Sequence, residues 1–210
     1  FEPIPAGKPY QRNLPKEPKQ NEERIAHTQA NVPLYAIYKA YKMPSRMHQD
    51  FQAADLLSDI LGRGKSSRLY EKLVKEQQIF NNIGAYITDS VDEGLLVISG
   101  NINQGLDLTA ANQAIENVIE EIISQGVEST ELERVQNKAL STFLFSEIEL
   151  LNRAMNLCYF TMLGDTDKLN QIEQNILEVN KEQVDRLAKY ILQKTNCSTL
   201  FYEKISSTEY

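Results

Sequence analysis

The chain has 210 residues, enough to bury the core of one large domain or of two small ones. Its 22 basic and 29 acidic residues give a net charge of -7, the sign opposite to that of a protein that binds a phosphate backbone. No apolar run approaches the roughly 20 residues that cross a bilayer, and two cysteines, Cys158 and Cys197, are too few for a disulfide framework. Composition therefore argues against nucleic-acid binding, against a membrane span and against a disulfide-rich fold, and both thiols are expected to be free.

The first 24 residues are rich in proline and in charged side chains. Five prolines fall between Pro3 and Pro18, and the segment has little apolar content to bury. Such a composition favours an extended chain, so residues 1–24 are predicted to be a linker. The chain also begins with FEPIP and not with methionine. We therefore expect a piece of a longer protein, in which this linker enters a domain at about residue 25.

Strand and helix patterns follow the linker. The second half of residues 24–44 alternates, with Tyr35, Ile37, Lys39 and Tyr41 on one face, which predicts a strand that ends at Pro44. Helical spacing of apolar residues predicts helices at about 48–61 and 66–77, separated by a loop with two glycines. Two further strands, within residues 79–90 and 93–102, are predicted to form an antiparallel hairpin.

The rest of the chain is predicted to be mostly helical. An apolar stripe runs through residues 106–126 and stops at Gly126. Thr130 and Glu133 have the spacing of a capping box for the next helix, which extends towards residue 164 with a break near 149–152. Asn180 opens a short helix over 181–192, and residues 197–205 form a last strand. This order predicts an α+β fold, an antiparallel sheet with helices packed on one face.

The residues alone predict no catalytic or metal site. His27 and His48 are the only histidines, and neither has a partner at the spacing of a zinc site, so both are expected at the surface. Gly64, Lys65 and Ser66 match the end of a phosphate-binding loop. The position five residues before Gly64 is Asp59 and not glycine, and the preceding segment is helical, which excludes that motif.

Several motifs in order resemble the pitrilysin/insulinase family of zinc peptidases, which includes mitochondrial processing peptidase. The segment DILGRGKSSRLYEKLVKEQQIFNNIGAY resembles the second, non-catalytic domain of that family, with its Leu-Gly-x-Gly, Ser-Ser-Arg-Leu and Ala-Tyr elements. GVESTELERVQNKAL and ILEVNKEQVDRLAKYIL resemble two helix starts of the same domain, and FEPIP resembles the end of the first domain. The resemblance extends over nearly the whole chain.

The resemblance implies the fold of mitochondrial processing peptidase-like metallohydrolases, with residues 1–24 as inter-domain linker, 25–205 as the non-catalytic domain and 206–210 as a tail. It also implies that this domain forms one wall of the peptide-binding chamber of a zinc metalloendopeptidase. The family holds zinc through His-x-x-Glu-His in the first domain, so no cofactor is expected in this chain. Expected partners are that catalytic N-terminal domain, a homologous chain in a homo- or heterodimer, and a peptide substrate. The alternative is a structural or assembly domain of a catalytically inactive homologue.

Specific positions also follow from the resemblance. Some relatives anchor substrate with an arginine and a tyrosine seven residues apart, and those positions hold Val74 and Asn81 in this chain. Because valine lacks the charge and asparagine lacks the phenol, no substrate-binding, catalytic or metal-ligating residue is assigned. Arg68 is interpreted as an ion-pairing residue and not as a substrate contact. The sequence leaves the compartment open between the cytoplasm and the periplasm of a bacterium.

Overall fold

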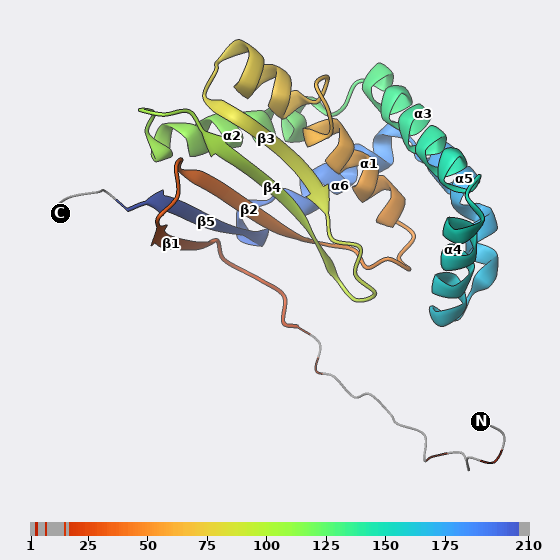
Figure 1. Cartoon of the computed structure of the whole chain (residues 1–210). Coiled ribbons are helices and arrows are strands. Elements are labelled where there is room, and N and C mark those ends of the chain that lie inside the picture. The colour runs from red at the N-terminus through yellow and green to blue at the C-terminus, as the bar shows by residue number, and fades with distance from the viewer. Residues whose placement is uncertain (1–2, 4–6, 8–14, 16, 206–210) are drawn as a thin grey trace.

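A computed structural model describes Pro3, Gly7, Pro15 and residues 17–205 (Figure 1). Most of the predicted linker, including FEPIP apart from Pro3, and the predicted tail 206–210 lie outside the described residues. The described elements, in chain order, are β1 (Arg24–Ala30), β2 (Ala36–Met43), α1 (Phe51–Gly62), the π-helical η1 (Tyr70–Glu76), β3 (Phe80–Ile87), β4 (Gly94–Ile102), α2 (Leu108–Gln125), α3 (Ser129–Ser146), α4 (Leu150–Met162), the 3-10 helix η2 (Thr166–Gln171), α5 (Ile172–Glu178), α6 (Lys181–Ile191), the 3-10 helix η3 (Lys194–Asn196) and β5 (Cys197–Lys204).

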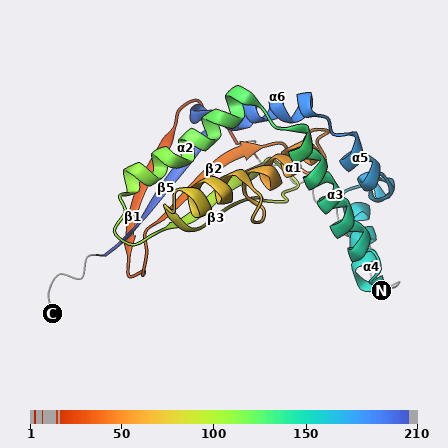
Figure 2. The same ribbon diagram turned by 90° about the horizontal axis from the view of Figure 1, so that it is seen from above.

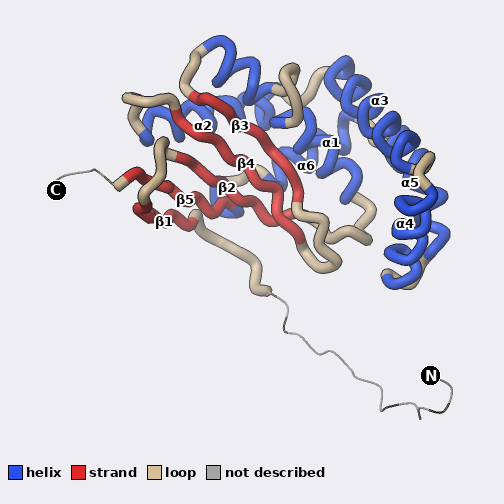
Figure 3. Tube along the Cα trace, in the orientation of Figure 1, coloured by secondary structure: helices blue, strands red, loops and turns tan. Residues whose placement is uncertain are grey.

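The five strands form one sheet in the order β1-β5-β2-β4-β3 (Figure 3). β2 pairs antiparallel with β4 and β5, and β3 pairs antiparallel with β4, so the predicted hairpin is confirmed. In contrast, β1 pairs in parallel with β5. The predicted α+β class is confirmed, but the sheet is mixed and not antiparallel throughout. β1 and β5 come from opposite ends of the chain, so no hairpin fixes their relative direction.

One face of the sheet carries the core. In β2, Ile37, Lys39 and Tyr41 are buried, whereas Tyr38 between them is 41% exposed. Lys39 donates a hydrogen bond to Asn112 in α2, which places the buried side chains of β2 beneath the helices. Seen along the sheet, α2 and α6 lie on one side of it, and α3, α4 and α5 extend from one end as an arm (Figure 2). In the part that the structure describes, no helix is long and apolar enough to cross a membrane.

The loop after α1 needs its two glycines for different reasons. Gly62 lies so close to β3 that a Cβ atom there would stand 2.6 Å from the Cβ atom of Ala85. Gly64 has a φ angle of +93°, which side-chain-bearing residues rarely adopt. Ser67 uses its hydroxyl to donate to the Gly64 carbonyl at 2.7 Å, and Ser66 accepts from an arginine of α3. Both hydroxyls therefore help to hold the loop in place.

The helix expected over 66–77 is shorter and mostly π-helical. Helical backbone begins at Arg68 and takes the π form through η1. The amide of Gln77 bonds to the carbonyl of Lys72, five residues back, at 3.0 Å. A run of this length with i to i−5 bonds is rare and has no signal in apolar spacing, so the sequence predicts only an ordinary helix.

The capping residues of α3 differ from the prediction, whereas those of α6 agree with it. α3 is capped by Glu128 and Glu131, not by Thr130 and Glu133, and the Glu131 carboxylate accepts from the Glu128 amide at 2.8 Å. Both pairs have the same spacing, but the Glu131 carboxylate is also bound by an arginine from another segment. At α6, Asn180 accepts from the amide of Gln183 at 2.9 Å, as predicted.

The arm contains the predicted break and two elements that the sequence did not predict. α3 ends at Ser146 and α4 begins at Leu150, close to the expected break at 149–152. η2 and α5 follow α4, where no helix was predicted. These elements are short and mainly exposed, so their apolar periodicity is weak.

The end of the predicted linker is bound to the domain. Gln20 is 5% exposed and donates to the carbonyl of Cys197 at 2.7 Å. Lys42 in β2 donates to the carbonyl of Pro18 and pairs with Glu17, each at 2.9 Å. The chain therefore enters β1 along a fixed path from residue 17 onwards.

Candidate functional site

Among the described residues, no three histidine, cysteine or acidic side chains come together closely enough to hold a metal ion. His27 lies on edge strand β1, where it contacts Glu203 at 3.0 Å and stacks on Phe201. His48 precedes α1 and accepts from the amide of Asp50 at 3.1 Å. The two histidines thus occupy separate sites, each with a local role.

Val74 and Asn81 lie on the elements where the sequence placed them. Val74 is in η1, half-buried against the core, and Asn81 is exposed near the start of β3. The register of β3 shifts between Phe80 and Asn82, so Asn81 sits in a bulge and has no partner in β4. Neither side chain brings a charge or a phenol to this end of the sheet.

We call the sheet face that the described helices leave uncovered the helix-free face (Figure 2). Strand registers place Tyr38, Ser99 and Leu200 side by side in one row of that face. Tyr86 lies opposite Val97 in the next row. Tyr38 is 41% exposed and Tyr86 is 51% exposed. Tyrosines on a pleated sheet present both an apolar ring and a hydroxyl, which suits contact with another polypeptide.

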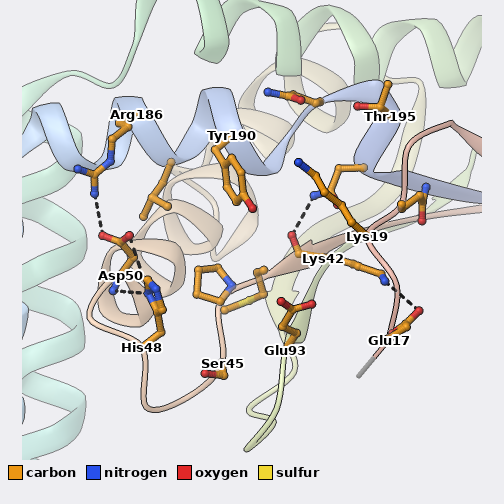
Figure 4. A pocket seen from close by; sticks show the side chains of 16 residues that line it. Glu17, Lys19, Lys42, Ser45, His48, Asp50, Glu93, Arg186, Tyr190 and Thr195 are labelled. Atoms are coloured by element: carbon orange, nitrogen blue, oxygen red, sulfur yellow. Dashed lines mark hydrogen bonds and ion pairs between the residues drawn. The ribbon is translucent and has the colours of Figure 1, made fainter. Parts of the chain in front are cut away.

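A cavity of about 610 Å³ lies between the linker, the end of β2 and α6 (Figure 4). On its α6 side, Asp50 accepts from Arg186 at 2.8 Å and from Gln183 at 3.2 Å. On its linker side, Lys42 pairs with Glu17. Two ion pairs, Arg186 with Asp50 and Lys42 with Glu17, therefore line this cavity, and the second of them ties the linker to the domain.

A buried polar cluster lies under α2. Lys39 is 1% exposed, and its ammonium donates to Asn112, Glu116 and Thr199 at 2.8, 3.3 and 3.2 Å. Burial alone would raise the pKa of Glu116, but hydrogen bonds and charges from Lys194 and Lys39 hold it below its usual value. All donors of Lys39 are satisfied within the fold, so the cluster stabilises the sheet–helix contact.

Burial, followed by the neighbouring Cys197, raises the pKa of Tyr41 well above its usual value. Cys197 is a buried free thiol, and Cys158 is an exposed one, so both predicted free thiols are confirmed. Only Cys197 has the environment of a small apolar core residue.

Arg68 is held by α3 and by the turn before it. Its guanidinium donates to both carboxylate oxygens of Glu131, at 2.9 and 2.7 Å, and to the carbonyl of Gly126 at 2.9 Å. The side chain is 11% exposed. Geometry therefore agrees with the interpretation of Arg68 as an ion-pairing residue.

Tyr38 and Tyr86 on the helix-free face were less evident from the sequence. Strand alternation was the one signal that could have marked them as outward-facing.

Comparison with known proteins gives consistent results. Residues 1–139 match the family described as the peptidase M16 inactive domain. Over 188 residues the chain is 25% identical to a Helicobacter pylori protein named zinc protease PqqE. The matched region covers 89% of this chain and 42% of that protein. The chain therefore spans less than half the length of that curated relative.

Solved structures show the same fold. A protease from Helicobacter pylori matches with a TM-score of 0.88 at 24% identity, over 94% of this chain and 48% of that one. The inactive peptidase domain of a protein from Bordetella parapertussis matches with a TM-score of 0.77 at 22% identity, over 86% of this chain and 97% of that one.

Proposed function

This chain belongs to the family of peptidase M16 inactive domains and is a non-catalytic domain, and we propose that it forms one wall of a chamber that binds an extended peptide. The helix-free sheet face, with its exposed Tyr38 and Tyr86, is the wall in this proposal. This face is the main support for the proposal, because an uncovered sheet face with exposed aromatic side chains in a folded domain suits a polypeptide ligand.

The catalytic centre belongs to a preceding domain in this proposal. A relative named zinc protease is more than twice the length of the matched chain, which leaves room for a first domain of similar size. That domain would carry a His-x-x-Glu-His motif, with two histidines and a further ligand on zinc and the glutamate as general base. The linker bound at Gln20 and Lys42 would hold the two domains in a fixed relation.

Peptide hydrolysis by the longer parent protein tests this function. Tyr38→Ala and Tyr86→Ala should each raise KM for an extended peptide several-fold and leave kcat unchanged, because they remove binding contacts far from the metal. Val91→Ala, which truncates an exposed apolar residue in the β3–β4 turn, is the matched control. Unchanged KM in both tyrosine variants of an active parent would refute the chamber wall.

The alternative is an assembly domain in an inactive homologue. It predicts a parent that lacks His-x-x-Glu-His upstream and hydrolyses no peptide even with zinc supplied. The sequence of the upstream residues and the amount of zinc bound by the parent separate the two functions.

A further inference from the structure

A second cavity lies between the arm and the body of the domain, which is the sheet with α1, α2 and α6. It holds about 440 Å³, within the range of roughly 300–1,000 Å³ that is usual for small-molecule sites. Arg46 and Gln52 line it from the loop before α1 and from α1 itself, and Phe160 and Lys168 line it from α4 and η2. A ligand in this cavity would therefore touch both the body and the arm.

Aromatic rings hold Arg46 in this cavity. Its guanidinium carbon lies 4.6 Å from the ring centre of Phe51 and 5.7 Å from that of Phe160, and both residues are 5% exposed. Its Nε atom is 3.5 Å from the Asp89 carboxylate in the β3–β4 turn. Its two terminal nitrogens donate to no acceptor among the described residues. Stacking on aromatic rings fixes the plane of the guanidinium and leaves these donors to an anion in the cavity.

Lys168 brings a second cation to the same cavity. Its side chain is half-buried and forms no ion pair or hydrogen bond with any residue that the structure describes. The one carboxylate in the lining, that of Glu178, accepts from Gln174 at 2.5 Å. Taking a cation out of water costs free energy, and an anionic partner offsets that cost. Two cations in one cavity therefore favour an anionic ligand, and they disfavour a metal ion or an amine.

Carboxamides supply most of the other polar groups of the lining. Four of them make no side-chain hydrogen bond within the described part of the chain: Gln49, Gln52, Gln171 and Asn175. A carboxamide can donate to the oxygens of an anion, and it can also bond to hydroxyl or amide groups beside them. The lining thus suits a small organic anion better than an apolar molecule.

We propose that this cavity binds a small organic anion, whose carboxylate or phosphate group lies against Arg46 and Lys168. Arg46 donates from its terminal nitrogens and Lys168 from its ammonium, and the carboxamides bind the rest of the ligand. Because Lys168 belongs to the arm and Arg46 to the body, the bound anion also fastens the arm to the body. The cavity lies apart from the helix-free face, so this proposal does not depend on the chamber wall.

Nuclear magnetic resonance titration of the 210-residue chain tests the site, with succinate and inorganic phosphate as separate probes for the two kinds of anion. At least one probe should bind with a Kd in the millimolar range or below and shift the amide signals of residues that line the cavity. Succinamide, the uncharged analogue of succinate, should not bind. Lys168→Gln should raise the Kd at least tenfold, about 1.4 kcal/mol, because it removes one of the two cations. Lys189→Gln, at an exposed position of α6 outside the cavity, should leave the Kd unchanged.

Arg46→Gln should weaken binding as Lys168→Gln does, and far-ultraviolet circular dichroism checks that each variant remains folded. Hydrogen exchange tests the link to the arm, because the bound anion should slow exchange in α4 and η2 and leave β1 unchanged. No shift with either probe, equal binding of succinamide, or a Kd that Lys168→Gln leaves unchanged would overturn the anion site. Binding without slower exchange in α4 and η2 would overturn the fastening of the arm.

Discussion

Arg68 and Glu131 join two segments that lie 63 residues apart, through two parallel hydrogen bonds from one guanidinium to one carboxylate. The same carboxylate caps α3 by accepting from the amide of Glu128. One ion pair therefore fixes both the segment after the glycine loop and the first turn of α3. Burial opposes the charge of Glu131, but the bonds from Arg68 and from that amide hold its pKa below the usual value.

Arg68→Gln should lower the free energy of unfolding by about 3 kcal/mol at pH 7, because it leaves a largely buried carboxylate without its partner. The pKa of Glu131 is lower in the folded state than in the unfolded state, so this contribution is present above pH 4.5 and is lost as pH falls below it. Urea denaturation at pH 7 and at about pH 3 measures it, and an equal difference at both pH values would contradict the assignment. Lys189→Gln, at an exposed position of α6, is the control.

Gly62→Ala should destabilise the fold by about 3 kcal/mol or more, because the added methyl group would collide with the backbone and side chain of Ala85 in β3. Gly105→Ala should cost only about 1 kcal/mol, since its φ of +87° is unfavourable but no atom lies near the added group. Thermal denaturation of both variants measures the contrast. Similar losses would mean that backbone conformation, and not close packing, explains Gly62.

Asp55→Asn should stabilise the protein by about 2 kcal/mol at pH 8. Burial, and then the neighbouring Asp59, raise the pKa of Asp55 to about 6. Because this value exceeds the unfolded one of 3.8, the charged form destabilises the fold above pH 6, and this penalty disappears as pH falls towards 4. Unfolding free energies of variant and wild type should therefore converge at pH 4. A variant that is less stable at pH 8 would show that the carboxylate makes a needed contact.

Lys39→Ala and Lys194→Ala remove two cations from the same carboxylate, that of Glu116, with N–O distances of 3.3 and 3.2 Å. Lys39→Ala should cost about 3 kcal/mol, because it also leaves a cavity and unpaired groups in the core. Lys194→Ala should cost less than about 1 kcal/mol, because its side chain is 64% exposed. Comparable costs from chemical denaturation would contradict the buried role of Lys39.

Restoring the family's anchoring pair with Val74→Arg and Asn81→Tyr should not increase peptide turnover by the parent protein. Val74 is half-buried against the core, so an arginine there loses apolar packing and gains no partner. Steady-state hydrolysis by the parent, with and without a homologous partner chain, measures this, and Lys75→Arg is a control at an exposed neighbour. A large gain in the parent alone would show that positions 74 and 81 of this domain anchor the substrate.

The sequence by itself determined the features that depend on neighbouring residues. Asn180 caps α6 because its side chain reaches an amide three residues on, and Gly126 ends α2 because its φ of 78° suits glycine. Apolar alternation placed β2 and β5, and the order of the motifs along the chain was enough to indicate the family. For the candidate site, the sequence placed Val74 and Asn81 on their elements but assigned neither to substrate binding, and it did not single out Tyr38 or Tyr86.

Only the tertiary structure decided the features that depend on distant residues. β1 is mainly exposed and lacks a clear alternation, and its place in the sheet comes from parallel bonds to β5, with Arg24 opposite Ser198. Glu131, and not Glu133, caps α3 because Arg68 from another segment holds its carboxylate. The helix-free face likewise forms only when the other four strands join β2 in one sheet. Local patterns set which residues form an element, whereas packing and hydrogen bonds between remote segments set where that element lies and what it leaves exposed.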